Sequence, residues 1–209
     1  MTHSTLLCAR HGQATSGPDH VWTPDDPLTE LGRRQAVELA DFIAQRKAPP
    51  TRIVASPFLR ARQTAEPVGA RLGLEVELDD RLGEFGNSTP SPYTLAQSHA
   101  AAPYDDIWFP GDAGWDGETI GAFWRRVASC SDELAERPGV TLVVSHHGTT
   151  SAMVRWALSI SPETPDSFDF AIPNASVTEI RSRVDRHGRT RRLLRRIGDA
   201  GFQASSTAL

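Results

Sequence analysis

Short apolar segments alternate with helical segments along the first third of this chain, and this alternation limits the possible folds more than any other feature. Apolar strands are expected at 4–9, 52–55 and 74–78, and amphipathic helices at 29–46 and 56–72. Connections this short favour a parallel sheet covered by helices, because each helix returns the chain to the same edge. The sequence therefore predicts an α/β fold, a three-layer αβα sandwich whose central sheet is mostly parallel.

Residues with strong capping preferences mark the ends of the two early helices. Thr29 is a suitable N-cap for the first, and Ser56 followed by Pro57 predicts that the second begins at Pro57. Gly73 is expected to end the second helix. Arg60 then falls in its first turns, where unpaired backbone N–H groups and the helix dipole favour an anion.

The second half of the chain continues with elements of the same kinds. They are a helix at 118–136, the clearest buried strand at 140–145, a helix at 149–158 and a hairpin at 176–197. Asp185 and Gly188 suit the turn of the hairpin. The small polar tail after Gly198 is expected to fray.

Between the two halves the regular pattern fails, because prolines interrupt it and aromatic residues crowd it. Residues 85–116 are therefore predicted to form a compact inserted cap that is packed by its own aromatic side chains. A length of 209 residues fits a single domain, 1–209, that carries this cap. The aromatic residues are Phe85, Tyr93, Tyr104, Trp108, Phe109 and Trp115.

The net charge of the chain is small and negative. Lysine and arginine together number 22, aspartate and glutamate 26, which gives a formal net charge of -4. No overall positive field draws such a protein to nucleic acid or to an anionic membrane. The first residues lack a charged leader with a long apolar run, and the two cysteines, Cys8 and Cys130, suit a reducing compartment. We expect a cytoplasmic protein without membrane or nucleic-acid partners, and a homodimer stays among the alternatives for its oligomeric state.

Arginines crowd the expected hairpin. Such a run can bind nucleic acid, but a charged hairpin at a sheet edge also resists pairing with other chains, and we favour this second interpretation. The residues are Arg181, Arg183, Arg186, Arg189, Arg191, Arg192, Arg195 and Arg196.

Two histidine-containing loops follow directly on apolar strands. Arg10 and His11 end the first strand, and His146 and His147 end a later one. In open α/β sheets, ligands bind beyond the carboxyl ends of strands, near the switch in strand order. With Arg60 at the start of its helix, guanidiniums and imidazoles are expected to converge on one anion. The residues predict a phosphate pocket.

Seven segments read, in chain order, LLCARHGQAT, PLTELGRRQA, ASPFLRARQTA, RLGEFG, WDGETIGAFWRRV, TLVVSHHGTTSAMV and IPNASVTEI. Their motifs and their order, from Leu6 to Ile180, resemble the histidine phosphatase superfamily in its phosphoglycerate mutase-like branch. One tripeptide carries little weight, but seven ordered segments are specific.

The resemblance implies a role for each of five residues. His11 would be the nucleophile that forms a phosphohistidine, while Arg10, Arg60 and His146 hold the phosphoryl oxygens. Glu84 would protonate the leaving oxygen and later activate water. Neutral imidazole is a competent nucleophile, and planar guanidiniums suit the charge on the equatorial oxygens. No metal or other cofactor is required.

The chain departs from the family's pattern in two places. After Glu84 the chain continues with GNST in place of the usual G-x-W-E-G element, so cap contacts are not transferred. The second histidine motif holds two histidines, and the ungapped count places the functional position at His146, with His147 as the alternative. Gln13 is the one further residue expected to contact the ligand.

The expected function is that of a metal-independent phosphatase that hydrolyses a small phosphorylated metabolite through a phosphohistidine intermediate. A phosphoglycerate mutase would use the same pocket, but a short cap leaves it open to water and favours hydrolysis. A catalytically idle phospholigand-binding module is the alternative from another class, although it would need neither His11 nor Glu84. The histidines could also be metal ligands, but no HExxH motif or clustered partner set accompanies them.

Overall fold

The elements follow the predicted alternation of strands and helices. The computed structural model describes residues 3–17, 19–86, 88–92, 94, 97, 111–114, 116–165 and 169–204. In chain order the elements are β1 (His3–Arg10), α1 (Glu30–Ala44), β2 (Arg52–Ala55), α2 (Leu59–Leu72), β3 (Val76–Leu78), the 3-10 turn η1 (Asp80–Leu82), α4 (Ile120–Glu136), β4 (Gly139–Ser145), α5 (His147–Ala157), β5 (Val177–Val184) and β6 (Thr190–Asp199).

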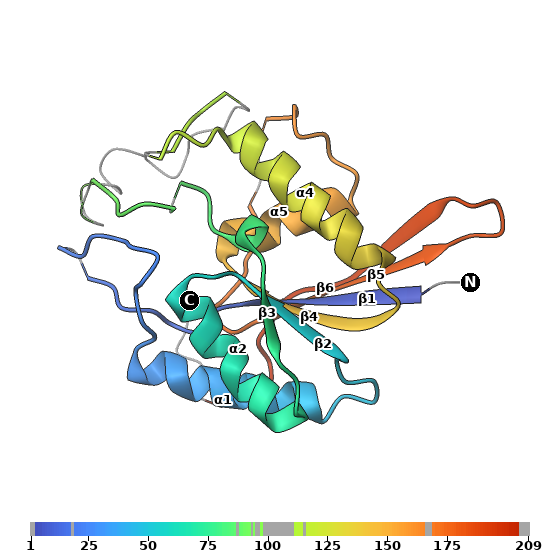
Figure 1. Ribbon diagram of the computed structural model, residues 1–209, viewed down its shortest axis with the longest axis horizontal. Coiled ribbons are helices and arrows are strands. Elements are labelled where there is room, and N and C mark those ends of the chain that lie inside the picture. Colours follow the sequence, from blue (N-terminus) through green and yellow to red (C-terminus); the bar gives the residue numbers. More distant parts are fainter. Residues whose placement is uncertain are drawn as a thin grey trace.

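The strands form one sheet between two layers of helices. The strand order is β3-β2-β4-β1-β5-β6. The first four strands of this order pair in parallel, and β5 and β6 extend the sheet by antiparallel pairing. Figure 1 shows α1 and α2 below the sheet and α4 and α5 above it. The predicted α/β fold with a mostly parallel sheet is confirmed. None of the helices in the described ranges is long and apolar enough to cross a membrane.

The central strand β1 is buried on both faces. Leu6 and Cys8 pack toward α4 and α5, whereas Leu7 and Ala9 pack toward α1 and α2. Burial on both faces explains why this strand reads as a continuous apolar run rather than an alternating one. The first polar side chains after it are therefore those that leave the core at its carboxyl end.

The switch in strand order lies between β1 and β4. These neighbours pair in parallel, with Arg10 opposite Ser145. The chain leaves β1 through α1, on one face of the sheet, and leaves β4 through α5, on the other face. Connections that diverge in this way open a crevice beyond the strand ends, where ligands of doubly wound folds bind.

The two predicted helix starts have different outcomes. Thr29 is confirmed as the N-cap of α1, because its hydroxyl accepts a hydrogen bond from the backbone of the first turn at 3.1 Å. The predicted start of the second helix at Pro57 is wrong, since α2 begins at Leu59 and has no side-chain cap. The hydroxyl of Ser56 is instead 2.8 Å from His146 Nε2, so a contact distant in sequence uses the side chain.

The last helix begins earlier than expected, and the hairpin is confirmed. α5 starts at His147 rather than Thr149, with His146 as the residue before it. In the hairpin turn, Gly188 N donates to Asp185 O at 3.0 Å. The φ of Gly188 is 75°, a value that favours glycine.

The described part of the tail, residues 199–204, is packed rather than frayed, and residues 205–209 lie outside the described ranges. Phe202 stacks on Phe42 of α1, with ring centroids 4.1 Å apart and planes tilted by 7°. Gln203 Nε2 donates to Asn174 O at 2.8 Å. One aromatic residue in an otherwise small, polar segment is enough to anchor it to the outer face of α1.

Most of the expected cap lies outside the described residues. Of its aromatic residues, Phe85 is described, and its ring packs against Phe123 of α4 with centroids 5.6 Å apart. The cap at 85–116 and the assignment of 1–209 to one domain stay predictions. The aromatic residues outside the described ranges are Tyr93, Tyr104, Trp108, Phe109 and Trp115.

The start of α1 packs directly on the loop after β1, which makes one glycine indispensable. A Cβ atom at Gly32 would lie 2.0 Å from the backbone carbonyl oxygen of Gln13. We expect Gly32→Ala to lower the free energy of unfolding by about 2–3 kcal/mol, because backbone on both sides has to shift. Urea unfolding followed by circular dichroism measures this. Gly17→Ala is the control, since nothing lies within 4 Å of its Cβ position; equal losses in both variants would contradict the close packing.

Candidate active site

His11 lies at the switch-point crevice and is held through its backbone. His11 N donates to Ser145 O at 2.9 Å, and its carbonyl accepts from Asn174 Nδ2 at 3.0 Å and from Ala175 N at 3.1 Å. The ring Nδ1 is 2.7 Å from Gly12 O. A carbonyl oxygen only accepts, so Nδ1 carries the ring proton and the neutral ring keeps its lone pair on Nε2.

The surroundings of His11 keep its ring neutral. Burial lowers the pKa of His11 well below its usual value of 6.5, and the nearby positive charges of Arg60 and Arg10 lower it further. The side chain is buried, with 6 % of its surface exposed. At neutral pH the ring is therefore an uncharged base with a free Nε2.

His146 packs edge-on against His11, with ring centroids 5.2 Å apart. Burial, followed by the charge of Arg60, lowers the pKa of His146 well below 6.5. Its Nε2 is 2.8 Å from Ser56 Oγ, which also accepts from Phe58 N at 3.3 Å. Donation of the single hydroxyl proton to Nε2 satisfies both groups and leaves the ring proton on Nδ1. This buried Nδ1 has no hydrogen-bond partner in the described part of the chain.

Arg10 and Arg60 bring two guanidiniums to the same crevice. Arg10 Nη1 donates to Ile172 O at 2.7 Å, and Arg60 Nη1 donates to Thr23 O at 2.9 Å. Their Nε atoms are buried and lack hydrogen-bond partners among the residues described. Burial lowers the pKa of both groups, and the negative charge of Glu84 opposes this shift. Buried cations with unused donors define an anion site.

Aromatic rings fix the position of Arg60 relative to the histidines. The guanidinium carbon is 5.1 Å from the ring centroid of Phe58 and 5.7 Å from that of Trp22. The Phe58 ring in turn is centred 5.0 Å from that of His146. Because the ring of Phe58 lies between the two groups, the guanidinium and the imidazole keep a fixed separation at the start of α2.

Glu84 reaches the crevice from the loop after η1. Its Oε1 accepts from Phe85 N at 3.0 Å, and its Oε2 accepts from Gly148 N at 2.9 Å, in the first turn of α5. A Cβ atom at Gly148 would lie 2.5 Å from Glu84 Oε1. The carboxyl group is thus held against the helix that follows His146, and glycine at 148 makes room for it.

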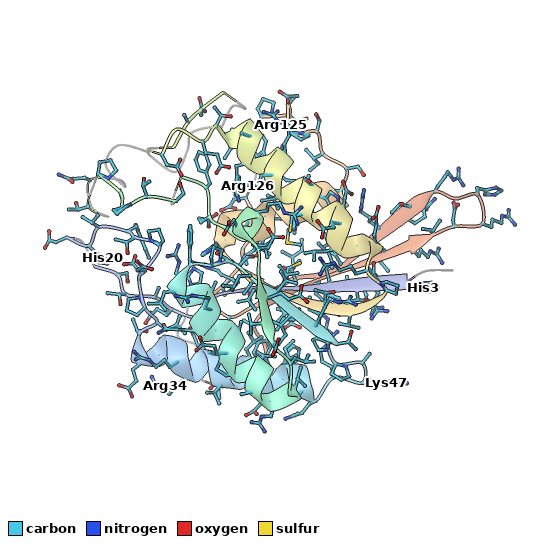
Figure 2. The ribbon with its side chains drawn as sticks, viewed as in Figure 1. His3, His20, Arg34, Lys47, Arg125 and Arg126 are labelled. Carbon is cyan, nitrogen blue, oxygen red and sulfur yellow. The ribbon has the colours of Figure 1, made fainter. Side chains whose placement is uncertain are left out.

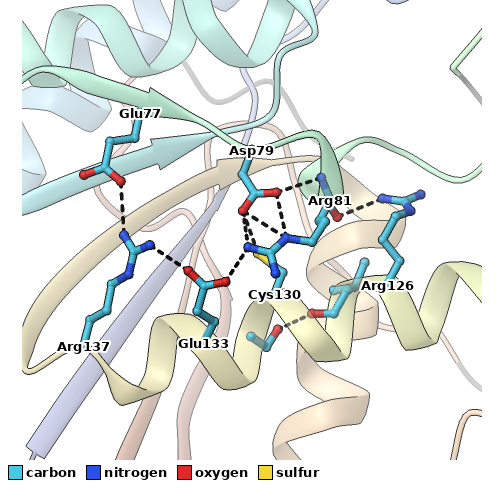
Figure 3. A network of polar contacts seen from close by, with 9 residues as sticks. Glu77, Asp79, Arg81, Arg126, Cys130, Glu133 and Arg137 are labelled. Atoms are coloured by element: carbon cyan, nitrogen blue, oxygen red, sulfur yellow. Dashed lines mark hydrogen bonds and ion pairs between the residues drawn. The ribbon is translucent and has the colours of Figure 1, made fainter.

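An ion-pair network ties the segment before Glu84 to α4. Figure 3 shows Arg81 between Asp79 and Glu133, and Arg137 between Glu133 and Glu77. The Arg81 guanidinium holds the pKa of Asp79 below its usual range. The exposed pairs add little stability individually, so their effect here is to fix where η1 lies.

Two further side chains fix the backbone next to Glu84. Arg126 Nη1 donates to Arg81 O at 2.8 Å and to Gly83 O at 3.1 Å. Thr149 Oγ1 donates to Gly83 O at 3.1 Å. Side chains from two helices, α4 and α5, therefore help to set the position of the carboxyl group.

Gln13 and His147, which the sequence predicts as ligand contacts, have protein partners. Gln13 Oε1 accepts from Thr29 Oγ1 at 2.8 Å, so its side chain supports the start of α1. His147 Nε2 donates to Phe170 O at 3.1 Å. The ring that packs on His11 belongs to His146, so the geometry favours His146 over His147 as a phosphoryl ligand. Ligand contacts by Gln13 and by His147 stay predictions.

Sequence reasoning missed the residues that orient the site. Ser56 binds the ring of His146, and Thr64 Oγ1 accepts from Gly12 N at 3.0 Å while donating to Arg60 O at 2.7 Å. The second arginine motif, ASPFLRARQTA, contains Ser56 and Thr64, and also Phe58, whose ring lies against Arg60. The spacing within this motif was therefore the signal that could have identified them.

A cavity of about 520 Å³ opens beside the anion site. Glu84 and Phe58 belong to its walls as well as to the surroundings of the anion site. An ester whose phosphoryl group occupied the anion site would therefore extend its remaining atoms into this cavity. Within the described ranges, no group of three His, Cys, Asp or Glu side chains could hold a metal ion.

The fold and this site define a doubly wound α/β protein with two guanidiniums and two imidazoles at its switch point, a set that suits a phosphate-like anion. The family model of the histidine phosphatase superfamily (branch 1) matches residues 6–196. The chain belongs to the histidine phosphatase superfamily, and the resemblance seen in its motifs is confirmed.

Similar proteins include phosphatases of mycobacteria. Glucosyl-3-phosphoglycerate phosphatase of Mycobacterium tuberculosis is 38% identical over 112 residues, which cover 53% of this chain and 49% of the relative. The chain thus spans about half the length of the curated relatives it matches. A solved mycobacterial glucosyl-3-phosphoglycerate phosphatase aligns with a TM-score of 0.73 and 27% identity over 95% of this chain and 100% of the other. Its complex with inorganic phosphate aligns with a TM-score of 0.72 and 26% identity over 98% and 100%.

The two buried histidines predict a loss of stability in mild acid. Their pKa values are lowered in the folded chain, so only the unfolded chain takes up these protons as the pH falls below 6.5. The free energy of unfolding should fall from pH 7.5 to 5.5, by up to about 1.4 kcal/mol per pH unit for each histidine. Denaturant unfolding in phosphate-free buffer measures it.

Two single-histidine variants test whether the buried histidines cause this loss of stability. His146→Asn should flatten the slope between pH 7.5 and 5.5, whereas His187→Asn, in the exposed hairpin turn, should keep it. A wild-type stability that does not change over this interval would show that the two rings are not held neutral.

Proposed function

We propose that this protein is a metal-independent phosphatase that hydrolyses small phosphomonoesters through a phosphohistidine formed at His11. One observation carries the proposal: two guanidiniums, whose buried Nε donors have no partner among the described residues, lie beside a neutral imidazole that keeps its lone pair on Nε2. The unused donors match phosphoryl oxygens, and the free nitrogen matches a nucleophile. A module that only bound an anion would need the first feature and not the second.

In the first step, His11 Nε2 attacks phosphorus and a P–N bond forms while the bond to the ester oxygen breaks. The protonated Glu84 gives its proton to that leaving oxygen. The donors of Arg10, Arg60 and His146 Nδ1 hold the three equatorial oxygens, on which negative charge is spread. The bond from Nδ1 to Gly12 O stabilises the positive charge that the His11 ring acquires.

In the second step, water replaces the alcohol. Glu84, now a carboxylate, takes a proton from a water molecule that attacks phosphorus, and the P–N bond breaks. Its electron pair returns to Nε2 of His11, and inorganic phosphate leaves. The reaction needs no redox change, and the carboxyl group ends each cycle protonated, as it began.

The comparisons support this proposal at the level of reaction class. Similar mycobacterial proteins are named glucosyl-3-phosphoglycerate phosphatases, and one is solved in complex with inorganic phosphate. We therefore take the substrates to be small phosphomonoesters. We also infer that the pocket of this protein binds phosphate, as the solved relative does.

Turnover of p-nitrophenyl phosphate in the presence of a chelator tests the proposed function. We expect hydrolysis that the chelator leaves unchanged, and an acid-labile phosphoenzyme on rapid quenching. His11→Ala should abolish the phosphoenzyme and lower kcat by about three orders of magnitude or more. His187→Ala is the control and should match the wild type. Wild-type turnover by His11→Ala would show that another group is the nucleophile.

Product analysis separates hydrolysis from transfer. With 3-phosphoglycerate as substrate, a phosphatase releases inorganic phosphate, whereas a mutase returns an isomeric phosphoglycerate. Appearance of the isomer without phosphate release would show that the protein is a mutase and not a phosphatase.

The space at Gly148 provides a test of Glu84. In Gly148→Ala the new methyl group would force the carboxyl group away from its position, because it would lie 2.5 Å from Glu84 Oε1. The flexible carboxyl end can move, so the variant should fold. We expect kcat/KM for glycerol 3-phosphate to fall about 10²-fold, while p-nitrophenyl phosphate loses far less, because its leaving group needs no proton. Gly111→Ala, with nothing within 4 Å, is the control. Equal losses for both substrates would contradict the proton-donor role.

A further inference from the structure

The walls of the 520 Å³ cavity carry more negative than positive charge. Among the described residues that line it are four carboxyl groups, those of Asp80, Glu84, Asp116 and Glu118, and one guanidinium, that of Arg126. Because Glu84 also borders the anion site, the leaving group of a bound ester would extend toward the carboxylates of Asp80, Asp116 and Glu118.

The positive charge of Arg126 is already matched. Its Nε and Nη2 donate to the two carboxylate oxygens of Glu118 at 2.7 and 2.6 Å. Its Nη1 donates to the carbonyl oxygens of Arg81 and Gly83. A bidentate pair with two further acceptors occupies most of the guanidinium donors, so this arginine holds the loop and offers little to an anion.

Three stretches of the sequence that supply residues to the site or its cavity contain neither lysine nor arginine. The chain has 22 such residues, yet none falls within 11–32, 82–124 or 156–180. These segments include the connections that leave β1 and enter β5 at the site, and the one that carries Glu84. Acidic residues in the same segments include Asp19, Asp25, Asp112 and Asp169.

The arginine-rich hairpin lies at the other end of the molecule. Figure 1 shows the β5–β6 hairpin, with its arginines, projecting beyond the amino end of β1 and away from the crevice. Figure 2 shows Lys47 at the same end as His3, with His20 on the opposite side. The hairpin therefore supplies no positive charge to the cavity.

We propose that the enzyme selects phosphomonoesters whose leaving group has no negative charge, and that it favours one bearing a protonated amine. The inference rests on the proposed phosphatase function and names the substrate class of that site. Arg60, 2% exposed, and the fully buried His146 keep buried donors without partners for one anion, the phosphoryl group. A second anion, such as a carboxylate, would face Asp80 and Asp116, whereas an amine would be attracted by them.

This selectivity is electrostatic and therefore acts over several ångströms. Exposed charges interact within a screening length of about 10 Å at 0.1 M salt, and a leaving group inside the cavity would lie against the walls that carry the carboxylates. The cavity walls reduce the local dielectric and strengthen the effect relative to open solvent. Discrimination should accordingly weaken as salt is added.

Three phosphomonoesters of similar size test the proposal: O-phosphoethanolamine, glycerol 3-phosphate and 3-phosphoglycerate. We expect kcat/KM to decrease in that order, with about tenfold or more between the first and the last, equivalent to about 1.4 kcal/mol. Raising the salt from about 20 to about 500 mM should narrow the ratio, because it screens both attraction and repulsion. Equal or reversed specificity at low salt would overturn the proposal.

A pair of charge reversals on either side of β3 locates the effect. Asp80→Lys changes an exposed carboxylate of the cavity wall and should shift the ratio toward 3-phosphoglycerate by about threefold or more. Glu75→Lys makes the same change in net charge at the amino end of β3 and should leave the ratio as in the wild type. A shift of equal size in both variants would show that net charge, and not this cavity, sets the preference. Asp80→Asn removes the negative charge without reversing it, so it should shift the ratio in the same direction by a smaller factor.

The outcome for p-nitrophenyl phosphate keeps the two proposals apart. If this compound and the three esters are all inert, both the phosphatase function and the inference fail. If it is hydrolysed and 3-phosphoglycerate is the best of the three esters, the function stands and the inference is overturned.

Discussion

Two guanidinium groups held inside the protein without a carboxylate partner impose the constraint on which the rest of this structure depends. A buried cation is costly unless its donors are satisfied, and here Ile172 O and Thr23 O satisfy only part of them. Arg10 is fixed by the pairing of β1 with β4, and Arg60 by the start of α2 between two aromatic rings. The sheet, its switch point and the loop at 13–28 thus combine to keep two sets of donors available to an anion.

The chemistry of the histidines follows from the same two cations. Burial lowers the pKa of each imidazole, and the positive charge of the two arginines lowers it further, so that the rings stay unprotonated. The partners of each ring then choose its tautomer: Gly12 O places the proton of His11 on Nδ1, and Ser56 leaves that of His146 on Nδ1 as well. His11 therefore presents a lone pair to the crevice and His146 presents a proton, although both residues follow adjacent parallel strands.

Local patterns in the sequence were sufficient for the strands, for the Thr29 cap and for the hairpin turn, because the determining contacts lie within a few residues. Contacts between distant residues account for the errors. Ser56 looked like a helix cap, but its partner His146 is 90 residues away, and the tail after Gly198 looked disordered because Phe42, on which Phe202 stacks, lies at the other end of the chain. The family motifs predicted that His11, Arg60, His146 and Glu84 share one site, and the structure places these residues near one another. That Gly148 makes room for the carboxyl group could be seen only in the structure.

β1 precedes the other five strands of the sheet in the chain, and it occupies an inner position between β4 and β5. Its hydrogen-bonding partners are residues 139–145 and 177–183, so both of its edges stay unpaired while most of the chain emerges from the ribosome. The strand is apolar on both faces, which makes the nascent chain a substrate for chaperones that bind extended apolar segments. Assembly of the crevice is consequently a late event in biosynthesis, and a stalled or truncated polypeptide that ends before β4 would contain His11 without Ser145 and Asn174, which hold its backbone.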